Sequence, residues 1–202
     1  MRVMLERVGG RLSLDFVNTI DPRSGPPSRE YLTDYDAVLD WCEGTDVSLP
    51  RSTTWLRRVA KQDAAAAAGA HRQVIATREA LFGVLEASLS ERPARRGDLA
   101  QLNASLGEGI GHRSLAPDDR GGVRETWRAS DALEQVLWPV AIDAWDLLTE
   151  PELARVRQCP PDHGGCGWLF LDTSRSGTRR WCDMRTCGNR AKVRAHYERR
   201  AH

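Results

Sequence analysis

The chain has 202 residues, of which 29 are basic and 28 acidic, so its formal net charge is +1. Hydrophobic residues make up 41% and charged residues 28% of the chain, as in an ordinary soluble globular protein. This length suits one full domain with a small second module, and no run approaches the roughly 20 consecutive apolar residues of a membrane span. The N-terminal residues lack the apolar core and cleavage site of a secretory signal. We therefore expect a cytoplasmic protein that does not engage a membrane.

The two parts of the chain differ in charge. Residues 151–202 carry eleven basic and five acidic side chains, a net charge of +6, whereas residues 1–150 carry 18 basic and 23 acidic ones, a net charge of −5. Segment 174–202 alone holds nine basic and two acidic residues, a net charge of +7. A mildly acidic body followed by a basic end predicts a module that binds a polyanion. The alternative is a basic helix that is merely solvated.

The first sixty residues predict short elements. Residues 8–20 begin with strand-like alternation and end in an apolar run, which indicates a short buried strand or a first helical turn. A proline-rich loop follows over residues 21–29. One short helix is predicted between Thr33 and about Cys42, and another opens at Ser52.

Longer helices are predicted further along the chain. The longest pattern runs from Asp63, a plausible cap, to about Leu89, and a short helix follows over residues 98–106. The glycine-rich segment 107–128 predicts a β-hairpin or meander. A helix kinked at Pro139 is predicted over residues 131–148, and Thr149-Glu-Pro-Glu152 has the form of a capping box that opens another short helix.

Cysteine usage points to a metal. Cys42 stands alone, whereas four cysteines cluster within 29 residues near the C-terminus, a pattern that in a cytosolic chain indicates metal binding rather than disulfides. Four thiolates suit tetrahedral Zn²⁺ and leave no open position for water, and a tail with so few large apolar residues could hardly fold without a metal. We expect one structural zinc ion, and His163 is the alternative to one of the sulfur ligands. The predicted ligands are Cys159, Cys166, Cys182 and Cys187.

The residues between the cysteines predict the order of a treble clef. Trp168–Leu171 reads as an apolar strand and Arg179–Trp181 as its return strand, a hairpin that brings Cys182 beside Cys166. A helix over residues 189–200 follows the last cysteine. The expected fold class is α+β, with a predominantly helical domain and minor strands over residues 1–150 and a small treble-clef-like zinc finger over residues 151–202.

Two sets of motifs resemble known families. Residues 168–172 (WLFLD), 179–184 (RRWCDM) and 187–192 (CGNRAK) resemble the CGNR zinc-finger family. Residues 10–19 (GRLSLDFVNT), followed by Tyr35 and Trp41, look like the ABATE domain that usually precedes this finger. The resemblance implies a bacterial cytoplasmic regulator of transcription, described as stress-induced, whose zinc-stabilised tail binds nucleic acid.

The candidate contacts to nucleic acid lie in the expected hairpin and helix of the tail. Duplex DNA is the expected partner, and because a single small module binds weakly, a homodimer is expected too. Two residues have a structural alternative, Asn189 as a helix cap and Arg190 as a hydrogen-bond donor to the zinc-ligand sulfurs. The candidate residues are Arg175, Arg179, Arg180, Asn189, Arg190, Lys192, Arg194 and Arg199.

The N-terminal part offers a candidate site for an unknown small-molecule effector. Asp15, Asn18 and Thr19 stand beside an apolar run and could line a pocket, although such residues also satisfy backbone groups at turns. The chain has no G-x-S-x-G, P-loop or H-E-x-x-H motif, so we do not expect an enzyme. The competing function is a zinc-stabilised module that docks a protein or senses a ligand without binding nucleic acid.

Overall fold

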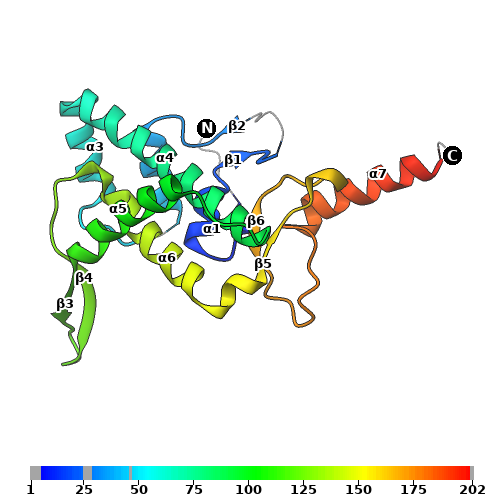
Figure 1. Cartoon of the computed structure of the whole chain (residues 1–202). Coiled ribbons are helices and arrows are strands. Elements are labelled where there is room, and N and C mark those ends of the chain that lie inside the picture. Colours follow the sequence, from blue (N-terminus) through cyan, green and yellow to red (C-terminus); the bar gives the residue numbers. More distant parts are fainter. Residues whose placement is uncertain (1–5, 25–28, 46, 201–202) are drawn as a thin grey trace. The chain divides into compact units, whose positions relative to one another are not determined.

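The computed structural model describes residues 6–24, 29–45 and 47–200, except the side chains of residues 195 and 198–200. Its packing divides the chain into two compact units. Figure 1 shows the whole chain, coloured by residue number from blue at the N-terminus to red at the C-terminus. Unit 1 contains the described residues up to Tyr31 together with those from Leu147 onward, and unit 2 is Leu32–Asp146. The N-terminal segment therefore packs with the C-terminal one, although the sequence places them on opposite sides of a boundary near residue 150.

Unit 2 is built mainly from helices, and three of them begin at a side-chain cap. Asp34, Ser52 and Asp63 each accept a hydrogen bond from a backbone N–H in the first turn of the following helix, at 2.8, 3.2 and 2.8 Å. Such caps satisfy donors that the helix itself leaves unpaired. The helices of unit 2 are α2 (Tyr35–Gly44), α3 (Thr53–Gln62), α4 (Ala64–Leu89), α5 (Arg96–His112), the 3₁₀ helix η1 (Leu133–Leu137) and α6 (Trp138–Thr149), which ends in unit 1.

The core of unit 2 forms around α4. This helix buries apolar side chains at helical spacing, among them Val74, Leu81 and Leu85, and it packs against α2, α3, α5 and η1. The expected helices at α2, α3 and α4 are confirmed, because periodicity and capping agree in each of them. Helix α5 is longer than expected and runs on to His112.

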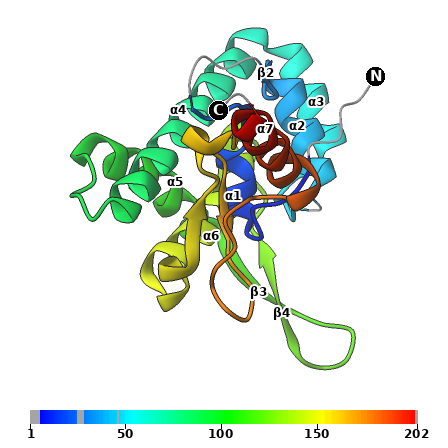
Figure 2. The same cartoon turned by 90° about the vertical axis from the view of Figure 1, so that its right-hand side faces the viewer.

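The predicted hairpin of unit 2 is confirmed over a shorter range. Strand β3 (Arg113–Pro117) pairs antiparallel with β4 (Val123–Trp127), and both views show this hairpin projecting from the helices (Figures 1 and 2). The segment expected as one helix kinked at Pro139 is the 3₁₀ helix η1 followed directly by α6. Pro139 is the second residue of α6, and a first-turn residue has no intrahelical N–H bond to lose.

Unit 1 combines one short helix with short strand pairs. Helix α1 (Leu12–Val17) resolves the open choice between strand and helix for this segment, and it packs against β6. The core includes Phe16 and Phe170, both about fully buried. The remaining elements are β1 (Ile20–Asp21), β2 (Arg29–Glu30), η2 (Pro151–Arg155), β5 (Val156–Gln158), η3 (Pro161–His163), β6 (Leu169–Leu171), η4 (Met184–Gly188) and α7 (Asn189–Arg200).

Two local predictions in unit 1 are wrong. The apolar strand is confirmed as β6, but it pairs antiparallel with β5 rather than with residues 179–181, which form no strand. The capping box at Thr149 does not form, because α6 continues through Thr149 and Glu150 precedes η2 without a side-chain cap. For the chain as a whole, the expected α+β class, mostly helical with minor strands, is confirmed. No helix within the described ranges is long and apolar enough to span a bilayer.

Candidate metal centre

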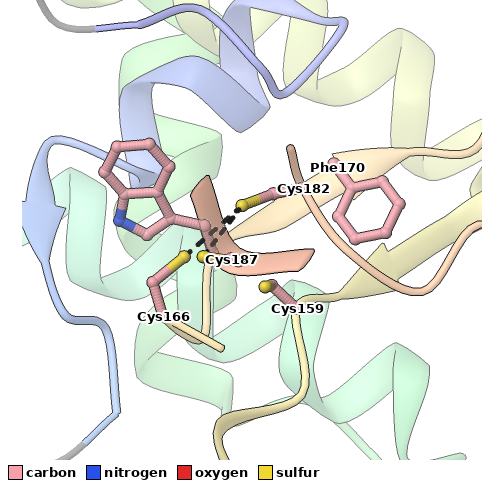
Figure 3. Close-up of a cluster of buried hydrophobic side chains, with 6 residues drawn as sticks. Cys159, Cys166, Phe170, Cys182 and Cys187 are labelled. Atoms are coloured by element: carbon pink, nitrogen blue, oxygen red, sulfur yellow. Dashed lines mark hydrogen bonds between the residues drawn. The ribbon is translucent and has the colours of Figure 1, made fainter. Parts of the chain in front are cut away.

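The four clustered cysteines meet at one point in unit 1. Cys159 directly follows β5 and Cys166 lies shortly before β6, so the pairing of these strands brings the first two together. Cys182 precedes η4 and Cys187 lies within it, just before α7. All four side chains are buried, and their sulfur atoms lie within 4.8 Å of one another (Figure 3).

The spacing of the sulfur atoms fits tetrahedral zinc. A Zn–S bond of about 2.3 Å places the sulfurs of a tetrahedral site roughly 3.8 Å apart. The Cys166 and Cys182 sulfurs are 3.5 Å apart, and those of Cys182 and Cys187 are 3.8 Å apart, too far for a disulfide. The cluster can therefore coordinate one zinc ion through Cys159, Cys166, Cys182 and Cys187. His163, the alternative ligand, lies in η3 and is not part of the cluster.

The thiols also act on one another electrostatically. Hydrogen bonds from Cys166, Cys182 and Cys187 lower the pKa of Cys159 below its ordinary value. A lowered pKa favours the thiolate, which is the form that binds a metal.

The turn between the first two cysteines requires glycine. A side chain on Gly165 would place its Cβ 2.8 Å from the Cys159 sulfur and 2.6 Å from the Pro160 carbonyl oxygen, and the preceding Gly164 has a φ of +86°. The Gly165 N–H donates to the Pro160 carbonyl at 2.9 Å, and the Cys159 N–H donates to the Trp168 carbonyl at 2.8 Å. These bonds hold the backbone of the turn that connects the two cysteines.

Arg179 and Asp172 hold the chain between β6 and Cys182. The Asp172 carboxylate is buried and accepts hydrogen bonds from the backbone N–H groups of Ser174 and Arg179, each at 2.9 Å. The Arg179 guanidinium donates to the carbonyls of Trp181, at 2.9 Å, and Cys182, and its centre lies 4.6 Å from the centroid of the Phe170 ring. Arg179, predicted to contact nucleic acid, is thus engaged in positioning Cys182.

The three candidate pocket residues of the N-terminal segment are buried and bonded to backbone. The Asn18 amide bonds both the N–H and the carbonyl of Leu169, and the Asp15 carboxylate accepts the Gly9 N–H at 2.8 Å. The Thr19 hydroxyl donates to the Phe16 carbonyl at 2.8 Å. All three side chains therefore hydrogen-bond to backbone groups, which is the alternative to a pocket that the sequence left open.

The other predicted nucleic-acid contacts lie mostly at the surface. Asn189 is exposed, and its amide donates to the Arg185 carbonyl at 3.1 Å, so this side chain contributes to the local structure at the start of α7. The side chain of Arg199 lies outside the described residues. The remaining predicted residues are all exposed: Arg175, Arg180, Arg190, Lys192 and Arg194.

Comparison with known families agrees with this architecture. Residues 10–151 match the sequence model of ABATE, described as "Putative stress-induced transcription regulator". The chain belongs to the ABATE family. Residues 155–200 of this ABATE chain match the CGNR zinc finger, so the four-sulfur cluster is the zinc site of that finger. No curated protein matches the chain.

Sequence reasoning missed one feature of this centre. The N-terminal residues 9–23 bond to residues 166–171 of the finger through Gly9, Asn18, Ile20 and Arg23. A polar motif that a local reading assigns to a pocket is therefore part of the fold around the zinc site. These hydrogen bonds join residues about 150 positions apart, so no local sequence pattern could have revealed them.

Proposed function

We propose that this ABATE chain is a cytoplasmic, non-catalytic regulator of transcription that binds nucleic acid, with duplex DNA as its ligand. The observation that carries the proposal is an exposed basic helix that starts at the zinc cluster. Cys187 lies two residues before α7, so a bound zinc ion would anchor the N-terminal end of that helix. Figure 1 shows α7 extending away from the rest of unit 1.

Charge favours a polyanionic partner. Segment 174–202 carries a net charge of +7, and a zinc ion bound by four thiolates contributes about −2, which leaves roughly +5. Cations that contact phosphates release counterions, and this release drives binding to nucleic acid. We define the basic set as the exposed residues Arg175, Arg180, Arg190, Lys192 and Arg194.

The shape of α7 suits a groove of duplex DNA. A single helix fits the major groove, where arginine side chains read guanine edges. Because the Asn189 amide already donates to the Arg185 carbonyl, we assign base reading to arginines of the basic set rather than to Asn189. Phosphate contacts from the remaining members would position the helix but would not select a sequence.

The test uses the full-length zinc-loaded protein with random duplex and single-stranded pools at two salt concentrations. The double variant Arg190→Ala with Lys192→Ala should weaken binding, and it should flatten the salt slope by about two units if both side chains contact phosphates. The matched control is Arg58→Ala with Arg72→Ala, which removes two exposed cations from unit 2. If the wild-type protein binds neither pool at low salt, the proposal is wrong.

A second candidate function is docking of a partner protein on α7. Val193 and Tyr197 lie one helical turn apart, and their side chains are 55% and 67% exposed. Apolar docking would depend little on salt, whereas phosphate binding falls steeply with salt. The same two-salt experiment, repeated with Tyr197→Ala, therefore separates the two functions.

We further propose that the protein acts as a homodimer, because two copies of α7 would give the specificity that one small module lacks. Sedimentation of the zinc-loaded protein with and without duplex tests this point. A monomer on a specific duplex site would exclude the dimer while leaving nucleic-acid binding intact.

A further inference from the structure

Unit 2 contains a pocket between its first three helices, far in sequence from the residues of the zinc finger. It has a volume of about 500 Å³, within the range of roughly 300–1,000 Å³ that small-molecule sites occupy. We call it the α2–α4 pocket. Its walls come from the start of α2, the second half of α3 and the first two turns of α4.

Small side chains create the space. Ala60 faces the pocket from α3, and Ala64, Ala67 and Ala68 face it from α4 at helical spacing. Only Asp63 separates α3 from α4, so the two helices diverge from a tight corner, and alanine side chains do not fill the gap between them. Leu39, fully buried, adds apolar surface from α2.

The acidic groups of the pocket already have partners. Asp34 caps α2 by accepting the Ala37 N–H at 2.8 Å. Asp36 bonds the Arg57 guanidinium at 3.0 Å, and Arg57 also pairs with Asp40 and with Glu43. These three acids surround the Arg57 guanidinium and hold it in place, so Arg57 is not left to bind an anionic ligand.

Lys61 and His71 are available instead. Within the part of the chain that the structure describes, the Lys61 ammonium has no ion-pair partner. The Nε2 of His71 donates to the Leu32 carbonyl at 2.7 Å, which leaves Nδ1 of the ring to hydrogen-bond a ligand. The pocket thus offers a largely apolar wall with one unpaired cation and one imidazole nitrogen.

We propose that the α2–α4 pocket binds a small monocarboxylate with an apolar body. The apolar body lies against the alanines and Leu39, and the carboxylate binds the Lys61 ammonium. Lys61 would repel an amine placed at the same position. Binding would link α2, α3 and α4, and would therefore stabilise unit 2 against unfolding.

The test is calorimetric titration of the full-length zinc-loaded protein with phenylbutyrate, phenylbutanol and phenylbutylamine. These probes share one apolar body and differ in the charge of the head group. Phenylbutyrate should bind most tightly, and Lys61→Gln should weaken it about tenfold, whereas Arg58→Gln, an exposed change on the same helix, should not. Backbone amide shifts should change at α2–α4.

Filling the pocket locates the site independently of charge. Ala67→Leu, or the more exposed Ala68→Leu, should abolish phenylbutyrate binding, whereas Ala65→Leu, on the same helix but outside the pocket, should leave it intact. Circular dichroism confirms that each variant is folded. The proposal is overturned if phenylbutyrate does not bind, if either filling variant binds it as the wild type does, or if the amine binds more tightly.

Discussion

The side-chain amide of Asn18 forms two hydrogen bonds with the backbone of Leu169, a residue 151 positions further along the chain. Its Oδ1 accepts the Leu169 N–H at 2.9 Å, and its Nδ2 donates to the Leu169 carbonyl at 2.8 Å. Both residues are buried. The amide thereby satisfies, for a three-residue strand, the backbone groups that a neighbouring strand would otherwise satisfy.

Replacing Asn18 should therefore destabilise unit 1. Asn18→Ala leaves a buried N–H and a buried carbonyl without this partner, and we expect a loss of about 2–4 kcal/mol in the free energy of unfolding. Urea unfolding of the zinc-loaded protein, followed by zinc release, measures it. Asn103→Ala, on the exposed surface of α5, is the control and should change stability by less than about 0.5 kcal/mol. Equal stability of the two variants would contradict this assignment.

The metal centre could be predicted from the sequence because its four ligands lie close together along the chain. Four cysteines in a short window with few large apolar residues leave zinc as the means of folding, and the structure brings all four together. The helices of unit 2 could be predicted for a similar reason. Caps such as Asp63 and a long apolar periodicity lie within one segment of chain, so they need no distant partner.

The strand pairing could not be predicted in the same way. Strand β6 has only three residues, so either β5 or residues 179–181 could have paired with it on pattern alone. The choice depends on Asp172 and Arg179, whose hydrogen bonds fold residues 172–182 into an irregular loop. The role of Asn18 depends on a partner about 150 residues away, which no local pattern encodes.

Cysteine substitutions should separate the zinc ligands from Cys42. Cys187→Ser removes one of four thiolates, so the purified protein should lose its stoichiometric zinc. Cys42 is buried in unit 2, where desolvation raises the pKa of its thiol to about 12, and Cys42→Ala should retain one zinc ion per chain. Metal analysis of both proteins decides the point. Stoichiometric zinc in the Cys187 variant would exclude this cysteine as a ligand.

Arg179 should support zinc affinity through the geometry of its guanidinium group and not only through its positive charge. Arg179→Lys keeps the positive charge but loses the planar group that bonds two carbonyls and stacks on Phe170. We expect zinc affinity to fall roughly tenfold, as for other residues that orient metal ligands. Arg180→Lys, an exposed neighbour, should leave zinc affinity unchanged. Competition with a chromogenic chelator measures both, and equal affinities would remove Arg179 from this role.

The hairpin of unit 2 should show a small, specific pH dependence. A hydrogen bond from Arg113, at 2.8 Å, lowers the pKa of Glu125. The resulting stabilisation is present above the unfolded pKa of glutamate, about 4.3, and is lost as the pH falls below that value. It should not exceed roughly 0.5 kcal/mol, because both side chains are about half exposed. Arg113→Gln should raise the Glu125 pKa in a carboxyl NMR titration. Arg124→Gln, elsewhere in the hairpin, should not.

The N-terminal segment should be required for tight zinc binding. The Leu171 N–H donates to the Gly9 carbonyl at 2.8 Å, the Trp168 indole donates to the Ile20 carbonyl at 2.7 Å, and the Arg23 N–H donates to the Cys166 carbonyl at 2.7 Å. Each bond ties the segment to the finger on or near a zinc ligand. Without them, backbone groups around Cys166 lose their buried partners, and the thiols are held less firmly.

A protein that lacks residues 1–31 should therefore bind zinc at least tenfold more weakly than the full chain, although all four cysteines remain. A separate peptide of residues 1–31 should restore affinity when added, and the same peptide with Asn18→Ala should restore less. Because the peptide contains no cysteine, any recovery must come from its hydrogen bonds and packing on the finger rather than from an added thiolate. If the shortened protein binds zinc as tightly as the full chain, the segment packs on the finger without supporting its metal site.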